Sequence, residues 1–373
     1  PVNSEQYAVL KLRPDGNCSF LNKDGLCIIH RDYGGSVLSN ACATYPRSYN
    51  IVGQRVELSA KLSCPEIARQ CLLAEDATEL VKVDPESVPP NILSTPLELP
   101  NPDPFLNYVD VVRYTVFKLL SLRECRIDVR LFYCAYFANR ISSFYYKNTT
   151  NFSEDNLAKE ISHIENPEVL DELYRKYNAM KIPNTVARTI IQSILDLHIH
   201  RPSADTRCRQ LFLDCLKSHQ AAGDVPGERE PEMAISYEKL WAGYEERKSF
   251  WESAYGDRID IYFANYCRNS WIQDLYVDST DLLTHLRILL VLFAVLRFLF
   301  YSHPDLENLR KTLNDTSVEK SAVIDSLDKV IVTVTYLFTK HTEHDKQFIE
   351  DIRKSLDEQD IKSFAHLVFL LKF

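Results

Sequence analysis

The chain contains 373 residues, which is enough to bury a large core in one large or two smaller domains. Its net charge of −9 at pH 7 argues against nucleic-acid binding, since such proteins usually carry a basic surface. Ten cysteines in a chain of this length do not resemble a small disulfide-stabilised secreted domain, so we expect a reducing, cytoplasmic environment.

Residues 1–82 form a cysteine-rich region that we expect to consist of loops and short strands. Apolar and polar residues alternate in 7–13 and 54–59, which predicts two strands that pair as a small β-hairpin beside the cysteine loops. The first helix is expected to begin at Pro65 and to run to about Ala74, because proline is favoured at the first position of a helix.

Four cysteines of this region lie among turn-forming residues: Cys18, Cys27, Cys42 and Cys64. An Asp-Gly turn dipeptide precedes each of the first two, so backbone N–H groups can point at the sulfur. Cys64 precedes Pro65 and is a predicted helix N-cap, where the helix dipole favours a thiolate. Thiolates bind zinc and iron–sulfur clusters. Metal ligation is slightly favoured over ordinary buried thiols, although no short C-x-x-C pair is present.

His30 follows Cys27 by three residues and has two interpretations of equal weight. It is either a metal ligand or base, or a hydrogen-bonded loop histidine. The remaining cysteines lie in apolar, helix-like surroundings, and we interpret them as core-packing residues: Cys71, Cys125, Cys134, Cys208, Cys215 and Cys267.

Residues 83–104 contain seven prolines and predict a linker rather than a helix. From residue 105 to 373, apolar residues follow helical spacing, which predicts an α-helical domain. The expected fold is mainly α, a multi-helix bundle or array. After a first helix capped by Asp103, the predicted helices cover 127–146, 155–179, 185–199, 203–221, 232–253, 256–274, 279–302, 317–341, 343–355 and 359–371.

The most hydrophobic stretch covers residues 286–301. Arg287 and Arg297 leave an uninterrupted apolar run of nine residues, well short of the ~20 that a membrane-spanning helix needs. We therefore predict a central core helix. A peripheral membrane contact is the second interpretation, because basic residues flank an apolar face.

Three motifs in the cysteine-rich region resemble the flagellin lysine-N-methylases of enteric bacteria. They are C-x-F-L-x-x-D-G-x-C from Cys18, L-S-x-x-C-x-x-Y-P-R from Leu38 and L-S-C-P-E-x-A-R from Leu62. The same motifs are more distantly similar to cysteine-cluster proteins of the zinc- or iron-chelating type. The matching motifs lie within residues 15–75, and the later helical region carries no comparably sharp signature.

The resemblance implies an enzyme that methylates flagellin lysines with S-adenosylmethionine in the cytoplasm, before flagellin is exported. It also implies an iron–sulfur cluster, of the 4Fe-4S type, with Cys18, Cys27, Cys42 and Cys64 as its candidate ligands. The family carries an earlier cysteine block near its N-terminus, which this sequence does not show. We therefore expect this chain to be folded but metal-poor and inactive.

Tyr45 and Arg47 flank Pro46 and are the candidate residues for binding S-adenosylmethionine. A guanidinium can hold a carboxylate by two hydrogen bonds; the alternative for Arg47 is bonding to loop carbonyls or a nearby Glu. The sequence has no G-x-G-x-x-G, so the usual Rossmann nucleotide site is not expected.

Two classes of function remain open at this point. The first is the cluster-dependent lysine methyltransferase, with flagellin as its partner. The second is a non-catalytic metal-binding module for structure or protein interaction, in which the cysteines hold loops onto a helical body. Spacing alone does not separate these classes, and it leaves open assembly into an oligomer.

Overall fold

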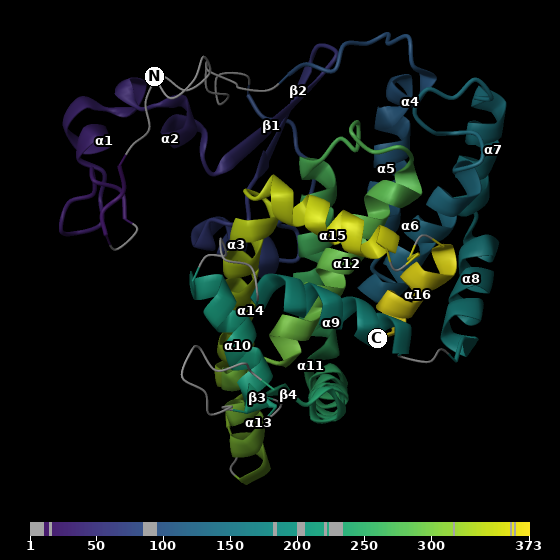
Figure 1. Cartoon of the computed structure of the whole chain (residues 1–373). Helices are drawn as coiled ribbons and strands as arrows, with labels where there is room; N and C mark the ends of the chain where they lie inside the picture. The colour runs from purple at the N-terminus through teal and green to yellow at the C-terminus, as the bar shows by residue number, and fades with distance from the viewer. Residues whose placement is uncertain are drawn as a thin grey trace.

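The computed structural model describes residues 11–14, 17–84, 95–181, 185–199, 206–219, 222–223, 234–315, 318–358, 360–361 and 363–373. Within these ranges the chain forms 16 α-helices and two short antiparallel sheets, which confirms the mainly α prediction (Figure 1).

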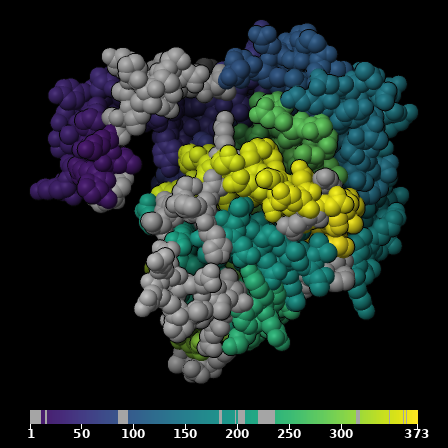
Figure 2. Space-filling view, viewed as in Figure 1, coloured from purple at the N-terminus to yellow at the C-terminus, as the bar shows by residue number. Residues whose placement is uncertain are grey.

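The N-terminal part is built from short elements. They are α1 (Ile28–Tyr33), the 3-10 helix η1 (Gly35–Val37), α2 (Asn40–Thr44), β1 (Arg47–Val52), β2 (Arg55–Ala60) and α3 (Pro65–Leu73). Figure 1 shows α1 and α2 set apart from the helical body, whereas α3 lies against it. The space-filling view in Figure 2 shows the same separation, with the C-terminal helices (yellow) running across this face of the body.

A small β-hairpin is present as predicted, but only one of its two strands was predicted correctly. Segment 54–59 pairs as β2 with the neighbouring strand β1, in a register that runs from Arg47↔Ala60 to Val52↔Arg55. The connecting loop begins with Gly53 at a φ of 57°, and glycine in this place suits a two-residue hairpin turn. Such a local closure costs less chain entropy than pairing with 7–13. Residues 7–10 lie outside the described part of the chain.

The body is made of the helices that follow Asp103. They are α4 (Pro104–Asn107), α5 (Val109–Leu120), α6 (Ile127–Ile141), α7 (Glu154–Ile164), α8 (Pro167–Ala179), α9 (Thr185–Ile199), α10 (Thr206–Ser218), α11 (Tyr237–Gln273), α12 (Leu282–Tyr301), α13 (Pro304–Asp315), α14 (Lys320–Thr342), α15 (Lys346–Glu358) and α16 (Phe364–Lys372). The second sheet pairs β3 (Ala222–Gly223) with β4 (Ala234–Ile235).

One predicted helix was wrong, and one predicted break between helices lies at a kink within a long helix. Segment 155–179 is two helices, because Pro167 lacks the N–H that would continue α7, and the Asn166 side chain caps α8 by accepting from the Glu168 N–H at 2.9 Å. Segments 232–253 and 256–274 are joined in one long helix, α11. Its chain bends at Tyr255, where the backbone leaves helical geometry (φ −136°, ψ 21°) without ending the helix.

Helix α12 lies in the middle of the body and packs against α11, α6, α14 and α16 (Figure 1). By length and composition it is apolar enough to cross a membrane, but 78% of its most apolar window is buried inside the fold. Both of its arginines have hydrogen-bond partners inside the fold. Arg287 pairs with Asp357 at 2.9 Å, and Arg297 donates to the Leu370 carbonyl at 2.8 Å. The structure therefore places this stretch in the core, as predicted.

One hydrophobic core connects the N-terminal part to the body. It includes Leu62, Ala68 and Leu72 from the cysteine-rich region together with the buried faces of the body helices. Four cysteines pack inside this core, which confirms their predicted packing role: Cys134, Cys208, Cys215 and Cys267. Cys71 and Cys125 are half-buried against it.

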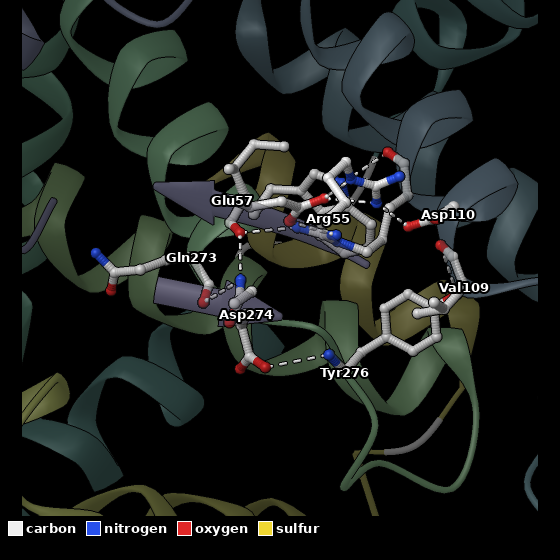
Figure 3. Close-up of polar contacts among 11 residues, drawn as sticks. Arg55, Glu57, Val109, Asp110, Gln273, Asp274 and Tyr276 are labelled. Atoms are coloured by element: carbon white, nitrogen blue, oxygen red, sulfur yellow. Dashed lines mark hydrogen bonds and ion pairs between the residues drawn. The ribbon is translucent and has the colours of Figure 1, made fainter. Parts of the chain in front are cut away.

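Ion pairs hold the hairpin against α5 and the end of α11 (Figure 3). Arg55 bonds Asp110 at 2.6 Å, and Glu57 accepts from the buried Arg113 at 2.9 Å. Arg113 also donates to the carbonyl of Ile272 at 2.8 Å. The hairpin is thus fixed to two helices of the body, and this fixes the wall of the cavity described below.

Candidate functional site

The four candidate metal ligands are distributed along the N-terminal part. Cys18 and Cys27 form isolated β-bridges with Leu12 and Leu21, and Cys42 is exposed on α2. As predicted, Cys64 is the N-cap residue of α3, with Pro65 at the start of the helix. His30 is exposed on α1.

These cysteines do not form a complete metal site in the part of the chain that the structure describes. No group of three or more His, Cys, Asp or Glu side chains suited to a metal ion is found among those residues. Cubane and two-iron clusters are held by four cysteine thiolates. The described residues therefore do not by themselves fit an iron–sulfur cluster, and the ligand role of Cys18, Cys27, Cys42 and Cys64 stays a prediction.

Tyr45 lies at a junction between the N-terminal part and the end of α14. Its hydroxyl is 3.5 Å from Ser63 Oγ, which is 2.9 Å from Nε2 of His344. The Glu343 carboxylate accepts the N–H groups of Leu62 at 3.0 Å and Ser63 at 3.1 Å. Because these contacts join segments far apart in the sequence, they anchor the start of α3 to the helical body.

Burial changes the acid–base behaviour of this junction. It raises the pKa of Glu343, although the bonds from Ser63 act in the opposite direction. It lowers the pKa of His344, with Lys61 acting in the same direction. Burial also raises the pKa of Tyr45, a residue that remains 43% exposed. Tyr45 thus lies in a structural junction, and its role in binding S-adenosylmethionine stays a prediction.

Arg47 instead lines a cavity of about 450 Å³, which we call the hairpin cavity. Its walls come from β2, from α3 and the segment that follows it to Leu80, and from residues 268–272 of α11. Leu58, Ile67 and Ile272 give it an apolar side. A volume of this size is in the range of small-molecule sites, which typically combine apolar walls with a few polar groups.

The most unusual polar group in the hairpin cavity is Arg268, which the sequence reasoning missed. Its side chain is on α11, is 7% exposed and donates to Oδ1 of Asn265 at 2.6 Å. Asn265 in turn donates to the carbonyls of Leu72 at 3.2 Å and Ala74 at 2.7 Å. Burial lowers the pKa of Arg268, and Arg130 acts in the same direction.

A pattern in the sequence could have indicated this face of α11. Asn265, Arg268 and Asn269 are spaced by three and four residues inside an otherwise aromatic and apolar segment. Residues with this spacing share one face of a helix. A polar face on a mainly apolar helix predicts either a polar contact with another element or a binding site. In this structure the face borders the hairpin cavity.

Arg268 also lines a second cavity, of about 370 Å³, which we call the arginine cavity. Three other arginines lie there, and each has a carboxylate within ion-pair distance. Arg130 bonds Asp260 at 2.8 Å, Arg126 bonds Glu252 at 3.0 Å, and Arg123 is 3.5 Å from Glu75. Arg268 separates the two cavities and is the one cavity-lining arginine of this group with no ion pair to a described residue.

Comparison with known proteins identifies the family. The profile of the FliB lysine N-methylase C-terminal domain matches residues 113–370. The chain belongs to this FliB family. The matched region covers the body from within α5 to α16, so it includes Arg268 but not Arg47 or the four candidate metal ligands.

Curated relatives of this FliB-family chain match over a shorter stretch. It is 33% identical over 79 residues, 21% of the chain, to the flagellar biosynthetic protein FliU of Salmonella muenchen, and this match covers 47% of that protein. The lysine-N-methylases of Salmonella typhimurium and Salmonella choleraesuis match equally well, with 20% of each covered. The chain thus matches less than half the length of these relatives. No solved structure matches it.

Proposed function

We propose that this chain is a protein-lysine N-methyltransferase that transfers a methyl group from S-adenosylmethionine to lysine ε-amino groups of flagellin. The observation that carries the proposal is the FliB lysine N-methylase match over residues 113–370. The motifs of the cysteine-rich region support it independently, because they lie outside the matched residues.

The hairpin cavity is the proposed site for the methyl donor. Its volume of about 450 Å³ and its apolar walls suit an adenosyl group, and its arginines suit a carboxylate. In the transfer, the neutral lysine nitrogen forms a bond to the methyl carbon, the carbon–sulfur bond breaks, and its electron pair stays on sulfur in the departing S-adenosylhomocysteine.

The acceptor lysine must lose a proton first, since an ammonium group has no lone pair. A desolvated surrounding disfavours the charged ammonium and so lowers the lysine pKa. Leu58, Ile67 and Ile272 provide such an apolar surrounding in the walls of the hairpin cavity. We assign these apolar walls to the adenosyl group and the reacting nitrogen, and the arginines to the carboxylate of the donor.

Flagellin is the proposed substrate and the cytoplasm the proposed location. One matched relative is named a flagellar biosynthetic protein and two are named lysine-N-methylases, which together favour a flagellar protein as the acceptor. The net charge of −9 suits a substrate that presents lysines. The described cysteines do not by themselves supply a cluster ligand set, and dependence of the transfer on an iron–sulfur cluster stays a prediction.

The test is methyl transfer to purified flagellin with S-adenosylmethionine that carries a deuterated methyl group. Peptide mass spectrometry should find the deuterated methyl group on flagellin lysines only when this chain is present. This result would also overturn the expectation from the sequence that the chain is inactive without the upstream cysteine block. Equal lysine methylation without the chain would refute the enzyme assignment and favour the non-catalytic module. Methylation without deuterium would refute S-adenosylmethionine as the donor but not the lysine target.

A further inference from the structure

The described part of the chain buries six arginines, and they differ in how their charge is compensated. They are Arg113, Arg130, Arg247, Arg268, Arg287 and Arg297. Four of them have a carboxylate within 2.9 Å. Arg297 donates to two main-chain carbonyls, those of Leu370 and Leu371. Arg268 has a single hydrogen bond to a neutral amide.

One donor of Arg268 has no partner in its surroundings. Its Nε is buried without a hydrogen-bond partner among the described residues, as are the Nε atoms of Arg113, Arg287 and Arg297. Arg268 differs from these three because neither a carboxylate nor a main-chain carbonyl accepts from its other nitrogens in the described part of the chain. The side-chain oxygen of Asn265 also accepts from the hydroxyl of Thr78 at 3.1 Å. The Asn265 oxygen therefore accepts a hydrogen bond from Thr78 as well, so it does not depend on Arg268 for a hydrogen-bond partner.

Two ionisable groups near Arg268, Cys71 and Glu79, raise its pKa, but neither provides a close counter-charge. Burial raises the pKa of the Cys71 thiol to about 12, so this thiol is uncharged at pH 7. The Glu79 carboxylate is largely exposed and lies 3.7 Å from Arg123. A buried guanidinium without a carboxylate is costly to retain, because it has lost water without gaining a counter-charge.

We propose that Arg268 is the carboxylate-binding residue of the hairpin cavity, where it holds the α-carboxylate of an amino-acid-bearing ligand. This inference rests on the proposed function, in which that ligand is S-adenosylmethionine. A guanidinium fits a carboxylate geometrically, and the bond is stronger away from water. The bound carboxylate would supply the counter-charge that the described residues do not.

This inference changes the role expected for Arg47. Arg47 is exposed at the border of the same cavity, so water competes for its hydrogen bonds. Arg268 is buried and is oriented by Asn265. Of the two arginines, the buried one should therefore contribute more to carboxylate recognition, and Arg47 is left with a smaller role at the rim.

The experiment compares two ligands by calorimetric titration of the full chain: S-adenosylmethionine and decarboxylated S-adenosylmethionine. The wild type should prefer the carboxylated compound by about tenfold or more, as expected for hydrogen bonds to a charged group. Arg268→Gln should remove this preference while it leaves affinity for the decarboxylated compound within about twofold. Arg268→Lys, which keeps the charge but not the planar fork, should keep part of the preference.

Two control variants separate this role from general effects. Arg69→Gln changes an exposed arginine of α3 that pairs with Glu66 outside the cavity, and both affinities should equal those of the wild type. Arg47→Gln should leave most of the preference for the carboxylated compound in place. The inference is overturned if the preference survives in Arg268→Gln, or if Arg47→Gln removes it instead.

The proposed function can fail separately from the carboxylate site. If neither compound binds the wild type, the donor assignment fails, and glutarate and inorganic phosphate become the probes in a thermal-shift assay. Stabilisation of the wild type by glutarate, absent in Arg268→Gln, would support a carboxylate site for another ligand. Stabilisation by phosphate alone, or no Arg268-dependent response, would overturn the inference.

Discussion

At the scale of single residues, a buried histidine connects the stability of the fold to pH. His219 follows α10, and neither of its ring nitrogens has a hydrogen-bond partner among the described residues. Burial lowers the pKa of its imidazole to about 3, and Arg247 acts in the same direction, whereas Glu307 opposes the shift. Its ordinary pKa is 6.5, so the unfolded chain takes up this proton first.

The stability contributed by neutral His219 should be present above pH 6.5 and lost as the pH falls towards 3. Between about pH 7.5 and pH 5, this group alone should lower the free energy of unfolding by about 2 kcal/mol. Urea unfolding of the wild type and of His219→Gln at both pH values measures the difference. The difference in unfolding free energy between the two proteins should change with pH. An equal difference at both pH values would show that His219 does not titrate in this way.

At the scale of elements, the sequence predicted most of the helices but not how they end or meet. Helix α9 has the predicted bounds among the residues that the structure describes, because its apolar spacing is regular. The predicted break between 253 and 256 falls at Tyr255, where the two parts of α11 meet at a kink. Helix α13 was not predicted, because its segment carries few apolar residues.

Helix α11 contains a glycine that packing requires. A Cβ at Gly243 would lie 2.5 Å from Nδ1 of His219. Alanine normally stabilises a helix relative to glycine by about 1 kcal/mol, but overpacking costs about 1–3 kcal/mol. Gly243→Ala should therefore lower the melting temperature.

Gly256 provides a matched comparison in the same helix. Its nearest neighbour would be Nη1 of Arg126 at 3.6 Å, an ordinary contact, so Gly256→Ala should not be destabilising. Adding His219→Ala to Gly243→Ala should remove the steric conflict. If Gly243→Ala and Gly256→Ala melt at the same temperature, close packing at His219 is not the cause.

The hairpin depends on one ion pair that water reaches poorly. Arg113 is 3% exposed and bonds Glu57 at 2.9 Å. Glu57→Ala would leave a buried cation without its carboxylate, which should cost about 3 kcal/mol of unfolding free energy. Chemical denaturation measures this loss.

Combining Glu57→Ala with Arg113→Met should recover much of the stability, since the second change removes the unpaired charge. Asp32→Ala serves as the control, because its partner Arg31 is well exposed and the pair should contribute little. A loss in Asp32→Ala as large as that in Glu57→Ala would contradict the assigned role of burial.

At the scale of the whole molecule, the candidate site is assembled from segments that the sequence keeps far apart. Arg47, Cys71 and Arg268 border one cavity, although 221 positions separate the first from the last. Local periodicity predicts helices but not which helix face meets the hairpin, since that choice depends on long-range packing. The sequence therefore indicated Arg47 through a motif, whereas Arg268 became visible only when the fold brought it beside the hairpin.

The core and the cysteine loops should respond differently to metal removal. The core contains none of Cys18, Cys27, Cys42 and Cys64, and it already joins α3 to the body. Metal bound by loops contributes to the folding of those loops rather than to a core formed without them. We therefore expect the chain, purified without oxygen, to carry little iron and sulfide and to melt at the same temperature with and without a chelator.

A variant with all four cysteines changed to serine should then melt at the same temperature as the wild type. Leu72→Ala changes a buried residue on the core side of α3 and should lower the free energy of unfolding by about 2–5 kcal/mol. Iron and sulfide analysis and thermal unfolding of the three proteins provide the comparison. Stoichiometric iron and sulfide in the wild type, lost in the serine variant together with stability, would show that the four cysteines form a metal site without further ligands. The fold would then depend on that site, and the separation of core from cysteine loops would be wrong.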